Sequence, residues 1–96
     1  MALYVVHHTH PADRCPAKDV AMASMLLKHL SRESAQQFGI TIQSEAVADG
    51  RHSLYLILEA ASKESVDRFM QPFVQAGSVD ILPASPCEVV VQRGVC

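Results

Sequence analysis

Residues 40–59 read ITIQSEAVADGRHSLYLILE and predict a β-hairpin. Two runs rich in β-branched and other apolar residues, 40–47 and 53–59, lie on either side of Asp49-Gly50, a dipeptide that favours a tight turn between strands. The second run, SLYLILE, is the strongest strand signal in the chain. The sequence on both sides of this hairpin predicts the remaining elements.

On the N-terminal side, residues 2–9 (ALYVVHHT) predict a first strand, because β-branched and aromatic residues dominate them. A helix is then expected from Pro16 to about Phe38. A proline suits the first turn of a helix, where its missing N–H would have no partner, and Gly39 is a typical residue after a helix end.

On the C-terminal side, Ser62 is expected to cap a second helix, with its apolar stripe over 66–73. Pro72 should kink or split that helix. Pro83 and Pro86 are expected to bracket a loop, and residues 87–92 (CEVVVQ) predict a last strand.

The resulting order is β-α-β-β-α-β, so residues 1–96 are predicted to form a single ferredoxin-like α+β domain. In that arrangement the strands lie in the order 4-1-3-2, all neighbours are antiparallel, and both helices cover one face. Side-chain alternation divides the strands into two sets. The helix-side set is expected to be Leu3, Val5, Ile40, Ile42, Leu54, Leu56, Leu58, Val89 and Val91. The open-face set is expected to be Tyr4, Val6, Tyr55, Ile57 and Val90, an apolar centre that predicts a homodimer through this face.

Composition narrows the classes of protein further. Apolar residues make up 49% of the chain and charged residues 19%, which is typical of a globular domain. A net charge of −2 without a basic cluster argues against a nucleic-acid partner. No apolar run is long enough for a bilayer and the N-terminus has no basic region, so no membrane partner and a cytoplasmic location are expected. The three cysteines are expected to be free thiols or metal ligands.

The segments YVVHHTH (4–10) and MQPFVQAGSVDILPAS (70–85), together with the order of elements, resemble the dimeric α/β-barrel superfamily. The chain is most similar to small bacterial members whose first strand ends in histidines. The resemblance implies two ferredoxin-like units that close a barrel. It does not select one activity, because members include cofactor-free isomerases and monooxygenases, haem-degrading enzymes and a nickel-binding branch.

Metal-capable side chains are concentrated in residues 7–15, HHTHPADRC. The strands over 53–59 and 87–92 are expected to run antiparallel to the strand over 2–9. Their N-terminal ends, which carry His52, Cys87 and Glu88, should therefore lie beside its C-terminal end. The sequence thus predicts that one edge of the sheet gathers His8, His10, Cys15, His52, Cys87 and Glu88.

Neutral imidazole and thiolate are ligands that suit zinc, nickel or copper. Alternation places His8, His10 and Glu88 on the open face, whereas His7 and Cys87 point to the helix side. The predicted metal ligands are His8, His10, Cys15, His52 and Glu88, and His7 and Cys87 are secondary candidates. The alternative is a solvated polar edge that binds nothing.

Three functions remain open on the sequence. The first is a homodimeric protein that binds a metal or a small molecule at this edge. The second is a cofactor-independent barrel enzyme, of isomerase or monooxygenase type, in which His8 or His10 acts as a general base. The third is an interaction module without chemistry. Cys15, near an expected helix N-terminus where negative charge is favoured, is also a candidate nucleophile or redox thiol, or simply a buried residue.

Overall fold

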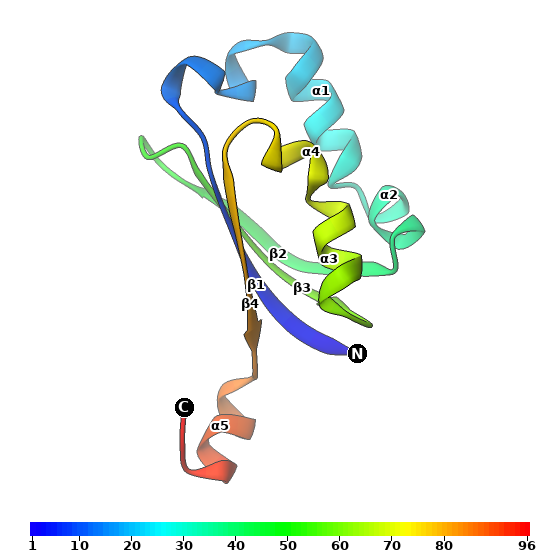
Figure 1. Ribbon diagram of the computed structural model, residues 1–96, viewed down its shortest axis with the longest axis vertical. Helices are drawn as coiled ribbons and strands as arrows, with labels where there is room; N and C mark the ends of the chain where they lie inside the picture. Colours follow the sequence, from blue (N-terminus) through cyan, green and yellow to red (C-terminus); the bar gives the residue numbers. More distant parts are fainter.

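The computed structural model describes residues 1–96, and its sheet forms as the hairpin signal predicts. Strands β1 (Ala2–Thr9), β2 (Ile40–Ala48), β3 (Ser53–Ala60) and β4 (Ser78–Ala84) form a four-stranded antiparallel sheet in the order β2-β3-β1-β4. This is the strand order expected from the sequence. Figure 1 shows helices α1 to α4 on one side of the sheet and the last helix beyond the end of β4.

The stretch expected to form one helix from Pro16 to Phe38 is broken into several pieces. Two short 3-10 turns, η1 (Ala12–Arg14) and η2 (Pro16–Lys18), precede α1 (Val20–His29) and α2 (Arg32–Gln37). The Asp19 carboxylate accepts hydrogen bonds from the N–H groups of Ala21 and Met22, so α1 begins there. Ser31 caps α2 in the same way and starts a new helix inside the predicted one.

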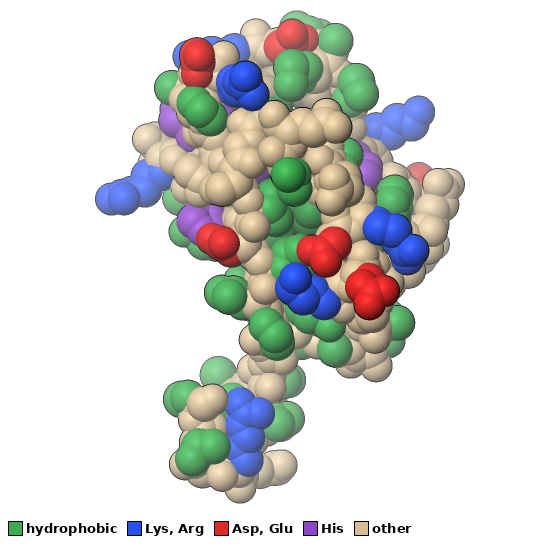
Figure 2. Space-filling view, viewed as in Figure 1, with side chains coloured by type: hydrophobic (Ala, Val, Ile, Leu, Met, Phe, Trp, Pro, Cys, Tyr) green, Lys and Arg blue, Asp and Glu red, His purple; other side chains and the backbone are tan.

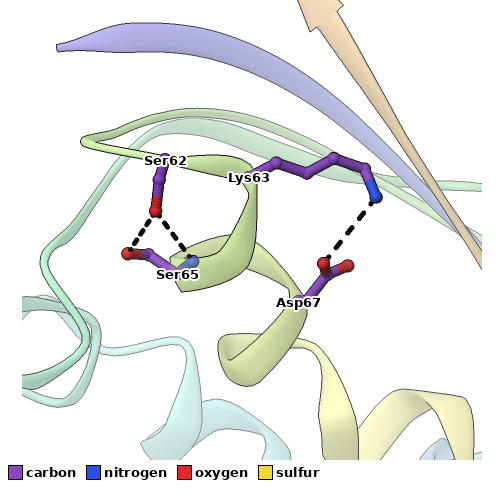
Figure 3. Close-up of polar contacts among 4 residues, drawn as sticks. All are labelled: Ser62, Lys63, Ser65 and Asp67. Carbon is purple, nitrogen blue, oxygen red and sulfur yellow. Dashed lines mark hydrogen bonds and ion pairs between the residues drawn. The ribbon is translucent and has the colours of Figure 1, made fainter.

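The second helical region confirms both of its predicted features. Ser62 caps α3 (Lys63–Phe69) by accepting a hydrogen bond from the Ser65 N–H at 3.3 Å, as Figure 3 shows. In the same view Lys63 forms an ion pair with Asp67 at 3.7 Å across one helical turn. Pro72 lies in a separate short helix, α4 (Gln71–Val74), so the expected split occurs.

The predicted last strand was wrong. Residues 78–84 form β4, and Cys87–Arg93 form helix α5, which ends at Gly94 in the left-handed region. The consecutive valines of α5 favour a strand locally. However, β4 already pairs with β1 from Leu3↔Ala84 to Thr9↔Ser78, so that side of β1 is filled. Pro83 is tolerated because β4 is an edge strand.

The core lies between the sheet and the helices. Its largest fully buried side chains are Phe69, Ile40, Leu56, Leu58, Met70, Val6 and Val66. The predicted faces of β2 and β3 are confirmed, but the faces of β1 were inverted. Tyr4 and Val6 are buried under the helices, opposite Leu58 and Leu56. Residues directly opposite in an antiparallel pair share a face. Leu3 and Val5 are as apolar as Tyr4 and Val6, so the sequence did not distinguish the two faces of β1.

The other face of the sheet carries no helix. On it, Tyr55 is 43% exposed, Ile57 39% and Leu82 55%. Val90, predicted to lie on this face, is instead in α5. Figure 2 shows α5 standing clear of the rest of the chain with apolar side chains on its surface, among which Val91 is 78% exposed. None of the helices combines the length and the hydropathy that a bilayer-spanning segment needs.

The central strand gives a direct test of this core. Leu56→Ala should lower the free energy of unfolding by roughly 2–5 kcal/mol, because Leu56 is fully buried beneath α3 and leaves a cavity. Urea denaturation followed by circular dichroism measures the change. Val47→Ala, at a position that is 59% exposed, is the control and should cost less than about 0.5 kcal/mol. A loss below about 1 kcal/mol for Leu56→Ala would contradict the assignment of its face.

Candidate metal centre

The candidate site lies where β1 ends, because two other segments begin or turn at the same edge of the sheet. Thr9 pairs with Ser53 at the start of β3, so the turn between β2 and β3 lies beside the end of β1. The N–H of His10 donates to the carbonyl of His52 at 3.2 Å and extends that pairing by one residue. The loop that carries η1 and η2 leaves from the same point.

Three of the predicted ligands converge at this edge. One ligand atom each of His10, Cys15 and His52 lies within 4.8 Å of the others, and all three residues are half-buried. Ligand atoms in a tetrahedral zinc site are separated by about 3.3–3.8 Å, given metal–ligand bonds of about 2.0–2.3 Å. The three atoms therefore need to approach one another by at most about 1.5 Å, the difference between 4.8 Å and about 3.3 Å, which side-chain rotation can supply.

Cys15 reaches the cluster because of the two short 3-10 turns. It ends η1, where its N–H donates to the carbonyl of Ala12 at 3.4 Å. It also begins η2, where its carbonyl accepts from the N–H of Lys18 at 3.2 Å. Pro16 fixes the backbone at the first position of η2. The thiol is thus held at a tight double turn rather than at the start of the long helix that the sequence predicts.

His52 has an unusual backbone conformation. Its φ of 50° makes it the only residue other than glycine with a positive φ in the chain. This left-handed region favours glycine, and among the other residues asparagine, aspartate and histidine are found there most often. Unfavourable backbone conformations of this kind cluster at functional sites. The positive φ of His52 therefore marks this turn as a position to test for function.

His8 supports the cluster from inside the sheet. It is only 2% exposed and lies on the helix face, opposite Leu54, because the face of β1 is inverted from the prediction. Its Nδ1 is 3.0 Å from the carbonyl oxygen of Ser78, and its Nε2 is 3.2 Å from Nδ1 of His10. The ring also makes an edge-on contact with Phe73, with centroids 5.2 Å apart. Both nitrogens of His8 are thus occupied.

These contacts fix the protons on both rings. A carbonyl can only accept, so His8 Nδ1 carries the proton and donates it to Ser78. Burial lowers the pKa of His8, and its Nε2 therefore accepts a hydrogen bond from the Nδ1–H of His10. The Nε2 of His10 is then left with a free lone pair. This atom is buried and has no hydrogen-bond partner.

The surroundings of His8 and His10 favour the neutral form of both imidazoles. Burial, and secondarily the neighbouring His52, lower the pKa of His10. For His8, burial is the larger cause, partly opposed by the hydrogen bond to Ser78, which raises the pKa. A metal ligand must be a neutral imidazole, so the lowered pKa values favour the form that binds a metal.

A close approach between β1 and the start of β4 holds the Ser78 carbonyl in place. A Cβ atom at Gly77 would collide with the carbonyl oxygen of Thr9 and the Cα of His10. Only glycine therefore fits where β4 crosses the end of β1. Sequence reasoning missed both Gly77 and Ser78, although the alternation in SVDIL directly after a glycine is a signal for a strand start.

The remaining predicted site residues lie elsewhere. His7 points to the open face, where its ring stacks on Tyr55 with centroids 4.5 Å apart. Cys87 and Glu88 belong to exposed α5 beyond the far end of β4, and their expected place beside β1 was wrong because 87–93 is not a strand. The structure therefore brings together His8, His10, Cys15 and His52, and separates the other three from them.

Comparison with known proteins identifies no relative of the chain. No protein-family model matches the chain, and no curated protein matches it significantly. The function is therefore inferred from the geometry of the cluster.

The buried neutral imidazoles predict a pH dependence of the metal-free protein. The pKa values of His8 and His10 are lowered from 6.5 in the folded state, so below about pH 6.5 the unfolded chain binds more protons than the folded chain. Stability should be complete above pH 6.5 and fall as the pH decreases from there towards the lowered values. The slope contributed by His8 is at most about 1.4 kcal/mol per pH unit.

Urea denaturation with a chelator present, between pH 8 and pH 5, measures this effect. His8→Asn, which retains a donor for the Ser78 carbonyl, should flatten the dependence. His7→Gln removes an imidazole on the other face, which is the smallest of the causes that lower the pKa of His8, and serves as the control with a nearly unchanged slope. Equal slopes in the His8→Asn variant and the unchanged protein would contradict the role of burial.

Proposed function

We propose that this protein binds one borderline transition-metal ion per chain through His10, Cys15 and His52. The observation that carries the proposal is the side chain of His10, whose Nε2 atom is buried without a partner and whose ring belongs to a cluster with a thiol and a second imidazole. A buried polar atom without a hydrogen bond costs stability, and a bound cation would satisfy it. His8 orients His10 from behind, as residues in contact with metal ligands commonly do.

The ligand types favour zinc, nickel or copper. Two neutral imidazoles and one thiolate are borderline-to-soft ligands, and the cluster contains no carboxylate of the kind that magnesium or calcium would need. All three cysteines are free thiols, which suits a reducing compartment such as the cytoplasm. In this proposal His8 is not a metal ligand but holds the ring of His10 through their hydrogen bond.

We propose in addition that the chain is a ferredoxin-like unit that forms a homodimer through the open face of its sheet. The support is the apolar surface of Val5, Tyr55, Ile57 and Leu82, of which the last three are between 39% and 55% exposed. An apolar patch of this kind on a small domain is typical of an association surface. Pairing of two such sheets is the arrangement implied by the resemblance to dimeric α/β-barrel proteins.

A cofactor-independent enzyme is the second candidate, and the same atom favours it. The free lone pair on the Nε2 of His10, on a ring whose pKa is lowered by burial, is also suited to accept a proton from a substrate. Under this alternative Cys15 and His52 are not ligands. Activity that persists in the presence of a strong chelator and in a Cys15→Ser variant would favour the enzyme over the metal site.

The metal proposal predicts one zinc, nickel or copper ion per chain in protein prepared without an affinity tag. His10→Ala and Cys15→Ser should each reduce affinity at least about 100-fold, since a three-ligand site loses its chelation with any one ligand. Binding should weaken below about pH 6, as imidazole and thiolate take up protons. Elemental analysis and competition with a coloured chelator measure both effects.

His52→Gly separates binding from folding. Glycine relieves the positive φ, so the metal-free variant should be at least as stable as the original protein while its metal affinity falls. His7→Ala and Cys96→Ser change a histidine and a cysteine outside the cluster and serve as controls with full metal content. Unchanged metal content in His10→Ala would remove the proposal.

The dimer proposal predicts twice the monomer mass at tens of micromolar protein in light scattering. Ile57→Glu places a charge in the centre of the open face and should give a folded monomer with an unchanged circular dichroism spectrum. Leu27→Glu, on α1 and 68% exposed, is the matched control and should remain dimeric. A monomeric unmodified protein at that concentration would contradict the proposal.

A further inference from the structure

The proposed metal site lacks a fourth ligand from its own chain. No Asp, Glu, Cys or further His joins His10, Cys15 and His52 within ligand distance. His8, the nearest other imidazole, has one nitrogen bonded to the Ser78 carbonyl and the other to His10. Three protein ligands with an open position are typical of zinc sites that bind an exchangeable molecule, whereas structural sites have four.

A groove lies directly behind this cluster, between α1 and α4. Its volume is about 510 Å³, within the range of small-molecule sites. His8 and Pro16 line it, and these residues contact or adjoin the cluster through the hydrogen bond to His10 and the peptide bond to Cys15. The groove therefore adjoins the metal site at His8 and Pro16.

The lining of the groove selects a chemical class. It is largely apolar, with Met22, Met25, Leu26 and Phe73, and its one charged side chain is Lys28. No acidic residue lines it. None of the ten residues of α1 is fully buried, and Met22 and Met25 on this helix remain 46% and 71% exposed. A ligand with an apolar body and a negative group fits both features.

We infer that the open position is filled by an anionic group of a small apolar molecule, such as a carboxylate with an alkyl chain, whose apolar part lies in this groove. The inference rests on the proposed metal site. A divalent ion bound to one thiolate retains a positive charge, which favours an anion as the remaining ligand. Lys28 adds a second positive charge at the groove, and the methionines provide an adaptable apolar surface.

The test uses the full chain loaded with cobalt(II), whose visible spectrum reports its ligands. Butanoate and octanoate are titrated separately. Octanoate should change the cobalt spectrum at a concentration at least about tenfold lower than butanoate, because its four additional methylene groups are buried in the groove. Met25→Glu should remove this preference for the longer chain while retaining cobalt, and Leu27→Glu, which lies on the same helix outside the groove, should not.

The outcomes distinguish the inference from the metal site on which it rests. Absence of the thiolate-to-cobalt absorption band would remove the metal site itself. A normal cobalt band that neither carboxylate changes would overturn the inference, since the fourth position would not accept an anion. Equal responses to both carboxylates, or an unchanged chain-length preference in Met25→Glu, would overturn the assignment of the groove.

Discussion

The pairing of β1 with a strand on each side is the constraint on which the rest of the structure depends. β1 lies between β3 and β4 and runs antiparallel to both. Its last residues therefore meet the start of β3 and the start of β4 at one edge of the sheet. The contacts of His8 with Ser78 and of His10 with His52 follow from that geometry. Segments that are 40 or more residues apart along the chain are thereby joined at one site.

The same strand connects stability with chemistry. Val6 and His8 are two residues apart and therefore lie on the same face of β1. Val6 belongs to the core, and His8 orients the cluster. Burial stabilises the domain through Val6 and lowers the pKa of His8. The free lone pair of His10 is a consequence of this burial. The Nε2 atom of neutral His8 accepts a hydrogen bond from the Nδ1–H of His10, so the other nitrogen of His10 carries no proton. The loop that carries Cys15 has no fully buried residue and is held by its two short turns and by Arg14, whose guanidinium donates to the Gln75 carbonyl at 3.2 Å.

The helices that cover the sheet are packed against it unequally. α3 contributes Val66 and Phe69 to the core, whereas α1 contributes no buried residue. His29 is the main link between these helices, since its Nε2 donates to the Phe69 carbonyl at 2.7 Å and its ring stacks on Phe69. Leu26 also packs against the core, but a groove remains beneath α1, and His8 lies in its lining.

The sequence by itself determined the hairpin, the Ser62 cap and the break at Pro72, because these depend on local turn, cap and proline chemistry. It also indicated His10, Cys15 and His52, since antiparallel strands bring their ends together. Tertiary structure alone decided which face of β1 is buried, because each of its two alternating sets contains apolar residues followed by a histidine, and only pairing with β3 distinguishes them. It also decided that 78–84 and not 87–92 completes the sheet: the valines of α5 have the local preference for a strand, but β1 has only one free side for a partner.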